Sequence, residues 1–513
     1  MSDSSESKQD KAGDKPTSTN LGSGPDEDVG NTTTDDAERV EKGSSDEQDP
    51  NIVFWDGPND PHNPKNWPDS KKWLNIGVMS VLTVITPLGS SMFAPGIPEI
   101  MTEFHSTSST VATFVLSIYI LGFAFGGLIV APLSEMYGRW PLYNVGNLLF
   151  TAFTIGAARS SSMGMLMAFR LLMGLSGAVP VTIGSGSIGD VMPVEKRGRA
   201  MATWALGPLL GPCVGPVAGG YLIQAAGWRW VFYLIAILGG ICIPIAFFGL
   251  QETFAPVLLD RKAARLRKET GNPLLTSKMA SEQDFKKKLQ ADVVRPLKFL
   301  TMAPIITAMS LYMAVTYAIL YLLITTFTFV YGKEYGFGEG TIGLTFLPAG
   351  IGMAIGVVSL GPLSDRLVKS RQGQGKEHRP EIRLIPYFSI PTGLAIPAGL
   401  FVYGWTTDKG VHWIVPMIGV AIFSAGLMGV MMCIQNYLID TYPLYAASVT
   451  AALSLFRSLL GALLPLCALQ MYDALGLGWG NSLLAFISLA LVPIPLVFYY
   501  FGANLRKRFH LNV

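Results

Sequence analysis

The segment Ala131-Pro-Leu-Ser-Glu135 recurs 230 residues later as Gly361-Pro-Leu-Ser-Asp365. Each copy directly follows a long apolar run. The same offset carries residue 74, where the first apolar run begins, to residue 304, near the start of the seventh run. Self-similarity at a fixed offset indicates a structural unit that occurs twice. The repeat therefore predicts two halves of the same build.

Apolar residues dominate this chain of 513 residues, with a mean hydropathy of +0.39 and only 14% charged residues. A membrane-spanning helix needs about 20 mainly apolar residues, and the break at 251–298 divides the candidate runs six and six. We expect an all-α membrane protein with twelve transmembrane helices in two pseudo-symmetric six-helix bundles. This composition argues against a nucleic-acid binder, a secreted disulfide scaffold and a soluble enzyme. The predicted spans are 74–94, 111–132, 141–158, 163–189, 200–222, 230–250, 301–330, 341–362, 384–404, 412–437, 446–470 and 481–502.

Lysine and arginine residues between the runs predict the orientation. With the N-terminus in the cytosol, the inside segments that follow the first span hold 24 of these residues and the outside loops hold four. Positively charged loops stay inside, and an even number of spans returns the C-terminus to the cytosol. The predicted parts are a disordered cytosolic tail (1–50), a juxtamembrane interfacial segment (51–73), an N-terminal six-helix bundle (74–250), a cytosolic linker loop (251–298), a C-terminal six-helix bundle (299–502) and a cytosolic tail (503–513).

Glycine and proline recur every four residues in the fifth predicted span. On a helix this period places each set in a slowly winding stripe. Small residues allow close helix approach, and proline bends a helix. We expect the run to act mechanically, as a bend or a seal between the halves, although simple close packing is the alternative. The residues are Gly207, Pro208, Gly211, Pro212, Gly215, Pro216, Gly219 and Gly220.

Two arginines, Arg170 and Arg457, lie inside predicted spans four and eleven. A buried arginine in a membrane is costly and needs a partner or a wet cavity. It can bind an anion or set the pKa of a neighbouring carboxylate. The alternative is a structural contact that ties helices together.

No Asp or Glu lies in the middle of a predicted span. Glu135 and Asp190, at the cytosolic ends of spans two and four, are the best candidates for proton coupling. The alternative is a charge network that latches the cytosolic gate. Asp365 with Arg366 is expected to form the matching latch in the second half.

Polar and aromatic side chains inside spans outline a candidate substrate cavity. Aromatic rings can hold flat or cationic organic molecules by stacking and cation–π attraction, although tyrosines near span ends often form an interfacial belt instead. The candidates are Asn144, Asn147, Tyr317, Tyr321, Gln435 and Asn436.

The sequence contains no Walker phosphate loop, HExxH, paired CxxC or Ser-His-Asp pattern, and its four cysteines lie in apolar runs. These motifs would indicate ATP, metal or catalytic sites. We therefore expect no enzyme activity, no metal, no cofactor and no use of ATP as the energy source; the proton gradient as energy source is what the resemblance described below implies.

Residues 51–513 resemble a fungal twelve-span member of the major facilitator superfamily. The resemblance is to its drug:proton antiporter group, which includes multidrug, polyamine and secondary-metabolite exporters. The run 207–220 is similar to the antiporter motif of that group, and Arg170 with Gly174 matches its span-four motif.

The superfamily motif between spans two and three is Gly-x-x-x-Asp-Arg-x-Gly-Arg-Arg. Glu135, Gly138 and Arg139 fit it, whereas Ala131, Met136 and Trp140 depart from it. The resemblance implies that Glu135 and Arg139 take part in gating.

The resemblance implies an alternating-access exporter in the plasma membrane that moves a small organic compound out of the cytosol in exchange for protons. We expect it to act as a monomer in the lipid bilayer, without a nucleic-acid partner. The alternatives are a proton-coupled symporter for nutrient uptake and a non-transporting membrane receptor.

Overall fold

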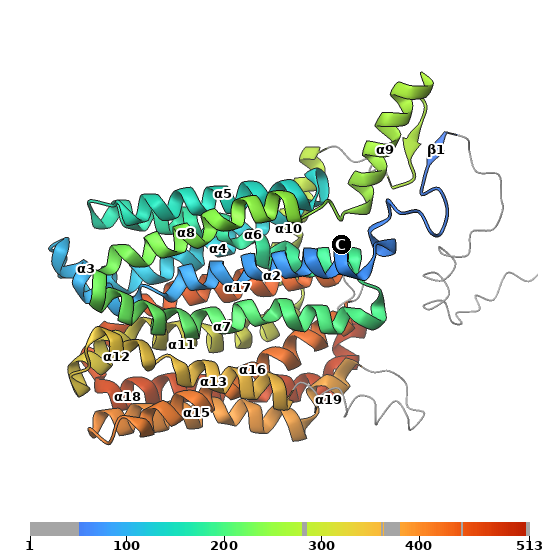
Figure 1. The fold of residues 1–513 in the computed structure, drawn as a ribbon. Coiled ribbons are helices and arrows are strands. Elements are labelled where there is room, and N and C mark those ends of the chain that lie inside the picture. The colour runs from blue at the N-terminus through green and yellow to red at the C-terminus, as the bar shows by residue number, and fades with distance from the viewer. Residues whose placement is uncertain (1–50, 280–284, 361–362, 364–379, 443–444, 509–513) are drawn as a thin grey trace, which may run out of the picture. The chain divides into compact units, whose positions relative to one another are not determined.

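The computed structural model describes residues 51–279, 285–360, 363, 380–442 and 445–508. From Val53 onward these residues form one compact unit that is almost entirely helical (Figure 1). Its elements are β1 (Ile52–Val53), η1 (Pro64–Asn66), α2 (Asp69–Ser91), η2 (Ala94–Gly96), α3 (Ile97–Glu103), α4 (Ser109–Tyr137), α5 (Arg139–Ala158), α6 (Met163–Val191), α7 (Val194–Ala226), α8 (Trp228–Gly249), α9 (Ala255–Thr270), β2 (Thr276–Ser277), α10 (Phe285–Met302), α11 (Pro304–Tyr335), α12 (Glu339–Leu344), α13 (Leu347–Ile355), η3 (Gly356–Leu360), η4 (Pro380–Leu384), α15 (Pro386–Asp408), α16 (Ile414–Thr441), α17 (Ala446–Leu463), η6 (Leu464–Cys467), α18 (Ala468–Leu491) and α19 (Pro493–Arg508).

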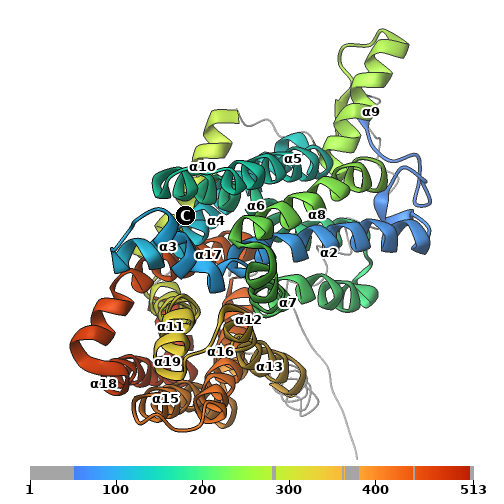
Figure 2. The ribbon, with the colours of Figure 1, turned by 60° about the vertical axis from the view of Figure 1, so that its left-hand side comes forward.

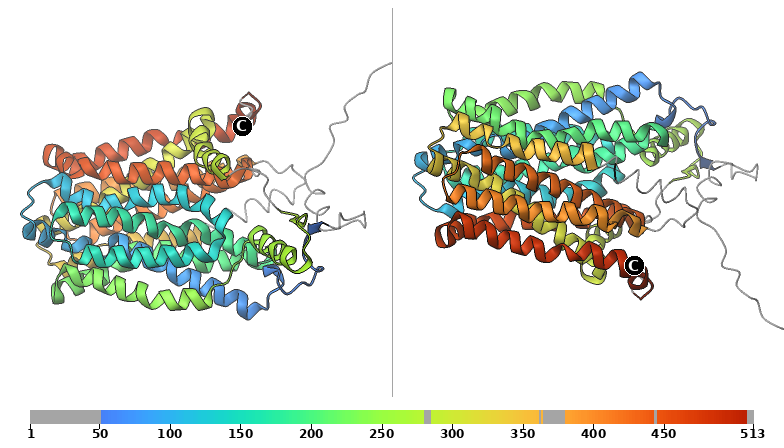
Figure 3. Two further views of the ribbon diagram at one scale, coloured as in Figure 1. Left: turned by 90° about the horizontal axis from the view of Figure 1, so that it is seen from above. Right: turned by 90° about the horizontal axis from the view of Figure 1, so that it is seen from below.

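The long helices lie side by side and give the bundle two ends (Figures 1 and 3). We call the end from which α9 projects the linker end, and the end that carries α3 and α12 the opposite end. Successive helices run back and forth between these ends, with tight turns between them. At Gly138, between α4 and α5, φ is +96°, a conformation that glycine adopts most readily.

Nine stretches of the described residues are long and apolar enough to cross a membrane. The last of them, Ser448–Arg506, has 59 residues and holds two crossings, because Gly476 breaks the helix with φ 74° and ψ 170°. Helices α5 and α7 fall outside this apolar set since they carry polar residues or repeated glycine and proline, yet they run the length of the bundle (Figure 1). The twelve crossings predicted from the sequence are therefore confirmed.

The helices form two groups, as Figure 2 shows. The first contains α2 and α4 to α8, and the second contains α11 to α13 and α15 to α19. Small residues let backbones meet inside each group. A Cβ atom on Gly174 would overlap the carbonyl oxygen of Tyr119, and one on Gly352 would overlap that of Ala421. This close approach is typical of helices packed in a membrane.

The two halves touch through α4 with α17, and through α7 with α12 and α13. The contact of α7 is backbone against backbone, since a Cβ on Gly343 would overlap the Pro216 carbonyl oxygen and one on Gly220 would overlap that of Glu339. The α12 end of this contact lies at the opposite end of the bundle (Figure 1). The halves are thus joined directly there.

Large apolar side chains are exposed on the outside of the bundle. Phe248 is 80% exposed, Val358 is 74% exposed and Val145 is 56% exposed. Side chains of this kind are stable in contact with lipid rather than water. The exposure agrees with the predicted membrane location.

The predicted linker loop contains helices α9 and α10. On α9, Leu259 and Ala263 are buried, and the Lys262 Nζ atom lies 2.6 Å from Asp56 Oδ1. The predicted juxtamembrane segment therefore packs against the linker. The predicted tail 1–50 and the end of the chain beyond Arg508 lie outside the described residues.

Candidate functional site

An ion pair joins the two helices α5 and α6 at the linker end. The Nε atom of Arg139 lies 3.2 Å from Oδ2 of Asp190, and both side chains are largely buried. Arg139 also donates to the Ser134 hydroxyl, and its guanidinium lies 4.5 Å from the ring centroid of Phe254. Because Gly138 turns the chain directly before it, Arg139 is fixed at the first residue of α5. Asp190 and Arg139, both predicted as gating residues, are thus in direct contact.

A buried carboxylate, Glu252, completes this network. Its Oε1 atom accepts the backbone N–H of Arg139 at 2.8 Å, and its Oε2 atom accepts that of Trp140 at 3.3 Å. The N–H groups of Thr253 and Phe254 also donate to Oε1, each at 3.0 Å. Glu252 therefore caps the positive N-terminus of α5. The sequence analysis missed this role because a carboxylate in a charged linker gives no sign that it is buried.

The second half carries an equivalent ion pair. The Nε atom of Arg383 lies 2.9 Å from Oδ2 of Asp440, which joins η4 to the end of α16. Arg506 of α19 lies 2.6 Å from Glu381 of η4. The sequence analysis did not predict either pair.

Two further predicted gating sites give less information. Asp365 and Arg366 lie outside the described residues. Glu135 is described, and its side chain is exposed near the last turn of α4.

Arg170 is fully buried between α2, α4 and α6. It donates hydrogen bonds to four backbone carbonyl oxygens, those of Gly89, Ser90, Val115 and Leu116. The distances are 2.8 Å to Ser90, 3.3 Å to Val115 and 3.4 Å to Leu116. Its guanidinium also lies 4.2 Å and 4.8 Å from the ring centroids of two aromatic residues, Phe93 and Tyr119. Four of its five N–H groups therefore have acceptors. Among the described residues Arg170 pairs with no carboxylate, so it ties helices together rather than setting the pKa of an acid.

The glycine stripe of α7 faces α2 within the first half. A Cβ on Gly219 would overlap the Met92 carbonyl oxygen, and one on Gly211 would overlap Pro87. At Gly215 the nearest atom would be the Ser91 hydroxyl oxygen, at 3.2 Å.

The other face of α7 meets the second half. The backbone of Pro216 contacts α12, and Cys213 contacts Gly350 of α13. Cys213, Pro216 and Gly220 thus contact the second half, whereas Gly207, Gly211, Gly215 and Gly219 pack within the first half. The role of this run as a bend or a seal stays a prediction.

Of the predicted cavity residues, the structure brings Tyr317 and Tyr321 of α11 together with Arg457 of α17. The two tyrosine rings have centroids 4.9 Å apart, and the Arg457 guanidinium lies 4.7 Å from the Tyr317 ring centroid. Gln435 and Asn436 lie half-buried on α16.

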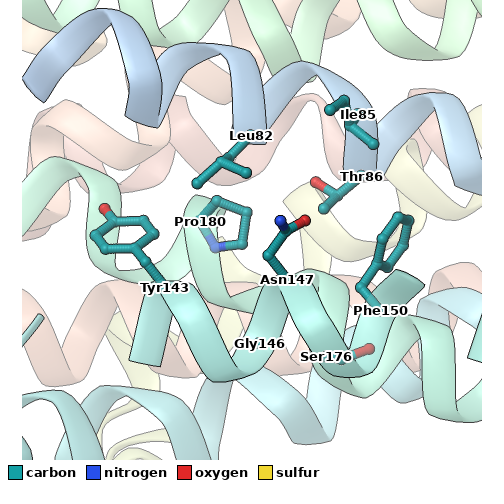
Figure 4. A pocket seen from close by; sticks show the side chains of 9 residues that line it. All are labelled: Leu82, Ile85, Thr86, Tyr143, Gly146, Asn147, Phe150, Ser176 and Pro180. Carbon is teal, nitrogen blue, oxygen red and sulfur yellow. The ribbon is translucent and has the colours of Figure 1, made fainter. Parts of the chain in front are cut away.

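Asn144 and Asn147 do not join this cluster. Asn147 donates to the Gly239 carbonyl oxygen of α8 at 3.1 Å, and Asn144 donates to that of Trp140 on its own helix at 2.9 Å. Asn147 also lines a small cavity of about 10 Å³ between α2, α5 and α6, with Thr86 and Ser176 nearby (Figure 4). Such a cavity holds about one water molecule. Asn147 thus faces the interior of the first half.

Comparisons with known proteins agree with this fold. The first relative, "Efflux pump radE" from Floropilus chiversii, is 49% identical over 464 residues, which cover 90% of this chain and 86% of that protein. "MFS-type transporter penM" from Penicillium rubens is 46% identical over 90% of each chain.

Among solved structures, a bacterial homologue of the human lysosomal transporter Spinster, inward-facing and unoccupied, matches with a TM-score of 0.60 at 15% identity, over 87% of this chain and 100% of that chain. The partially occluded, inward-open xylose transporter XylE from E. coli matches with a TM-score of 0.59 at 14% identity, over 84% and 99%. These structures share the fold.

The family model described as "Major Facilitator Superfamily" matches residues 79–465. Since the relatives are transporters, the predictions of a multi-pass membrane protein and of a protein that is not an enzyme are confirmed. The chain belongs to the major facilitator superfamily.

Proposed function

We propose that this protein exports a small organic compound across the plasma membrane in exchange for protons, by alternating access. The observation that carries the proposal is the two-faced packing of α7, which places glycines against α2, its backbone against α12 and the Cys213 side chain against α13. A helix held this closely on both sides can transmit movement between the halves. The similarity to a protein named as an efflux pump supports export.

The linker end is assigned to the cytosol in this proposal, which places both termini there. The contact of α7 with α12 at the opposite end would then close the outside while the cytosolic side is open. The Arg139–Asp190 and Arg383–Asp440 pairs, one in each half, would hold the helix ends at the cytosolic side.

Proton coupling in this proposal uses the carboxylates of the linker end. Asp190 is the best candidate, because protonation would remove its charge and weaken its pairing with Arg139. The protein would work as a monomer, since both halves of the path come from one chain.

The test has two stages. Compounds that accumulate in cells lacking the protein are identified first, and their uptake into inverted membrane vesicles is then measured with an acid-inside pH gradient. We expect the gradient to drive uptake and a protonophore to abolish it. Uptake that needs the opposite gradient would indicate a symporter, and a compound profile unchanged by deletion would contradict transport. We refer to the vesicle measurement below as the export assay.

A further inference from the structure

Arg457 lies on α17, and the described residues supply no hydrogen-bond acceptor to its Nε atom. The residue is half-buried, and the Nε atom itself is buried. None of the ion pairs formed by the described residues includes it. The Tyr317 ring centroid lies 4.7 Å from its guanidinium, and Tyr321 also lies close enough to interact with this charge. An unpaired cation in a membrane is costly, so an occupant that accepts its hydrogen bonds would be stabilised.

Arg170 shows that the scaffold can satisfy a buried guanidinium. Its donors meet four carbonyl oxygens, and two aromatic rings pack against it. Arg457 has no such cradle among the described residues. The contrast indicates that Arg457 is left open for a ligand, whereas Arg170 is structural.

The position of Arg457 is where the two halves meet. A Cβ atom on Gly461, one helical turn beyond it, would lie 3.3 Å from the Tyr317 ring and 3.8 Å from Ile120 of α4. Helices α11 and α17 of the second half thus adjoin α4 of the first half at this point. A compound that passes between the halves would meet these side chains.

Tyr317 and Tyr321 add a ring surface beside the cation. Their ring centroids are 4.9 Å apart with an interplanar angle of 49°, and Tyr317 is half-buried whereas Tyr321 is only 6% exposed. Aromatic pairs of this kind accept another ring by offset or edge contacts. The sequence has no carboxylate in the middle of any predicted span that could compete for the guanidinium.

We propose that Arg457 and the Tyr317–Tyr321 pair bind an acidic aromatic compound, with the ring against the tyrosines and a carboxylate or phenolate on the guanidinium. The planar guanidinium of arginine matches two carboxylate oxygens and forms strong charge-assisted hydrogen bonds. This inference rests on the proposed function, and it names the substrate class as an organic acid rather than a cation.

The test is equilibrium binding to the purified full-length protein in detergent at one fixed pH, without a gradient. Three fluorescent probes share one ring system: anthracene-2-carboxylate, its methyl ester, and an anthracene that carries a trimethylammonium group. We expect the carboxylate to bind most tightly and the ammonium probe least. Because a charge-assisted hydrogen bond contributes about 1.5–3 kcal/mol, Arg457→Gln should weaken carboxylate binding by roughly 10- to 100-fold.

The variants separate charge from packing. Arg457→Gln should change ester binding by less than about threefold, which also shows that the variant is folded, and Arg457→Lys should retain part of the carboxylate affinity. Tyr317→Leu should weaken all three probes together. Arg159→Gln, which removes an exposed arginine at the end of α5, is the matched control and should bind like the wild type.

Two outcomes would overturn the inference. One is equal loss of carboxylate and ester binding in Arg457→Gln, which would indicate packing; the other is a wild-type protein that does not prefer the carboxylate. Neither outcome bears on gradient-driven export, which the vesicle measurement tests separately. Conversely, charge-selective binding without gradient-driven export would retain this site and contradict the proposed antiport.

Discussion

The Nε atom of Arg383 lies 2.9 Å from Oδ2 of Asp440, so the second half holds the end of α16 as the Arg139–Asp190 pair holds the end of α6 in the first half. In each half an arginine before or at the start of one helix meets an aspartate at the end of the next helix. The repeat in sequence is thus also a repeat of ion pairs. This symmetry is expected if both helix ends must be held and released together.

Breaking one pair should impair export, and exchanging its charges should restore part of it. Asp190→Arg alone places two cations together in a partly buried site, where like charges repel. We expect the export rate to fall about tenfold or more, because an increase of about 1.4 kcal/mol in the activation free energy slows a process tenfold. Arg139→Asp combined with Asp190→Arg should recover a fraction of the rate, limited by the lost Ser134 contact. A double variant no better than either single variant would contradict the latch.

Arg170→Ala should abolish export and reduce stability without preventing membrane insertion. The substitution removes hydrogen bonds to four carbonyl oxygens that hold α2, α4 and α6 together. Each buried carbonyl oxygen that loses its donor costs about 1–3 kcal/mol. Thermal unfolding of the purified protein and the export assay check this, with Arg159→Ala as the control. Wild-type export at wild-type abundance would exclude Arg170 from the mechanism.

Alanine substitutions along α7 should differ in effect according to the local space. Gly219→Ala should lower the unfolding temperature and export, because its Cβ would overlap the Met92 carbonyl oxygen. Gly215→Ala should be milder, since its Cβ would lie 3.2 Å from the Ser91 hydroxyl oxygen, which can move. Gly240→Ala on α8 is the control, with nothing within 4 Å. Three equal effects would show that helix propensity, not close packing, governs these positions.

Glu252→Gln should loosen the linker end. The Glu252 carboxylate accepts hydrogen bonds from backbone N–H groups at the start of α5 and directly before α9. The amide nitrogen of a glutamine at this position cannot accept a hydrogen bond, so at least one of these N–H groups would lose its acceptor. Leaving a buried donor unpaired costs about 1–3 kcal/mol. Protease cleavage between α8 and α9 should become faster, and the neighbouring exposed Gln251→Ala is the control. Unchanged cleavage in Glu252→Gln would show that the cap does not hold the linker.

Hydropathy and the repeated motif were enough to predict the twelve crossings and the two halves, because a membrane requires long apolar helices. They could not predict the direction of each polar side chain. Asn147 was expected in the substrate cavity but bonds to Gly239 within the first half, since a helix in a bundle has several buried faces. Helices α9 and α10 and the burial of Glu252 were missed for a related reason, as their packing depends on distant segments.

The glycine stripe has a mechanical consequence. With Gly219 against the Met92 backbone, α7 and the end of α2 leave no room for a side chain between them. The contact of Gly220 with Glu339, by contrast, lies between the two halves, and in the proposed alternating-access cycle it would separate when the opposite end opens. Release of the compound on that side would then require α7 to move away from α12 while α7 stays packed against α2.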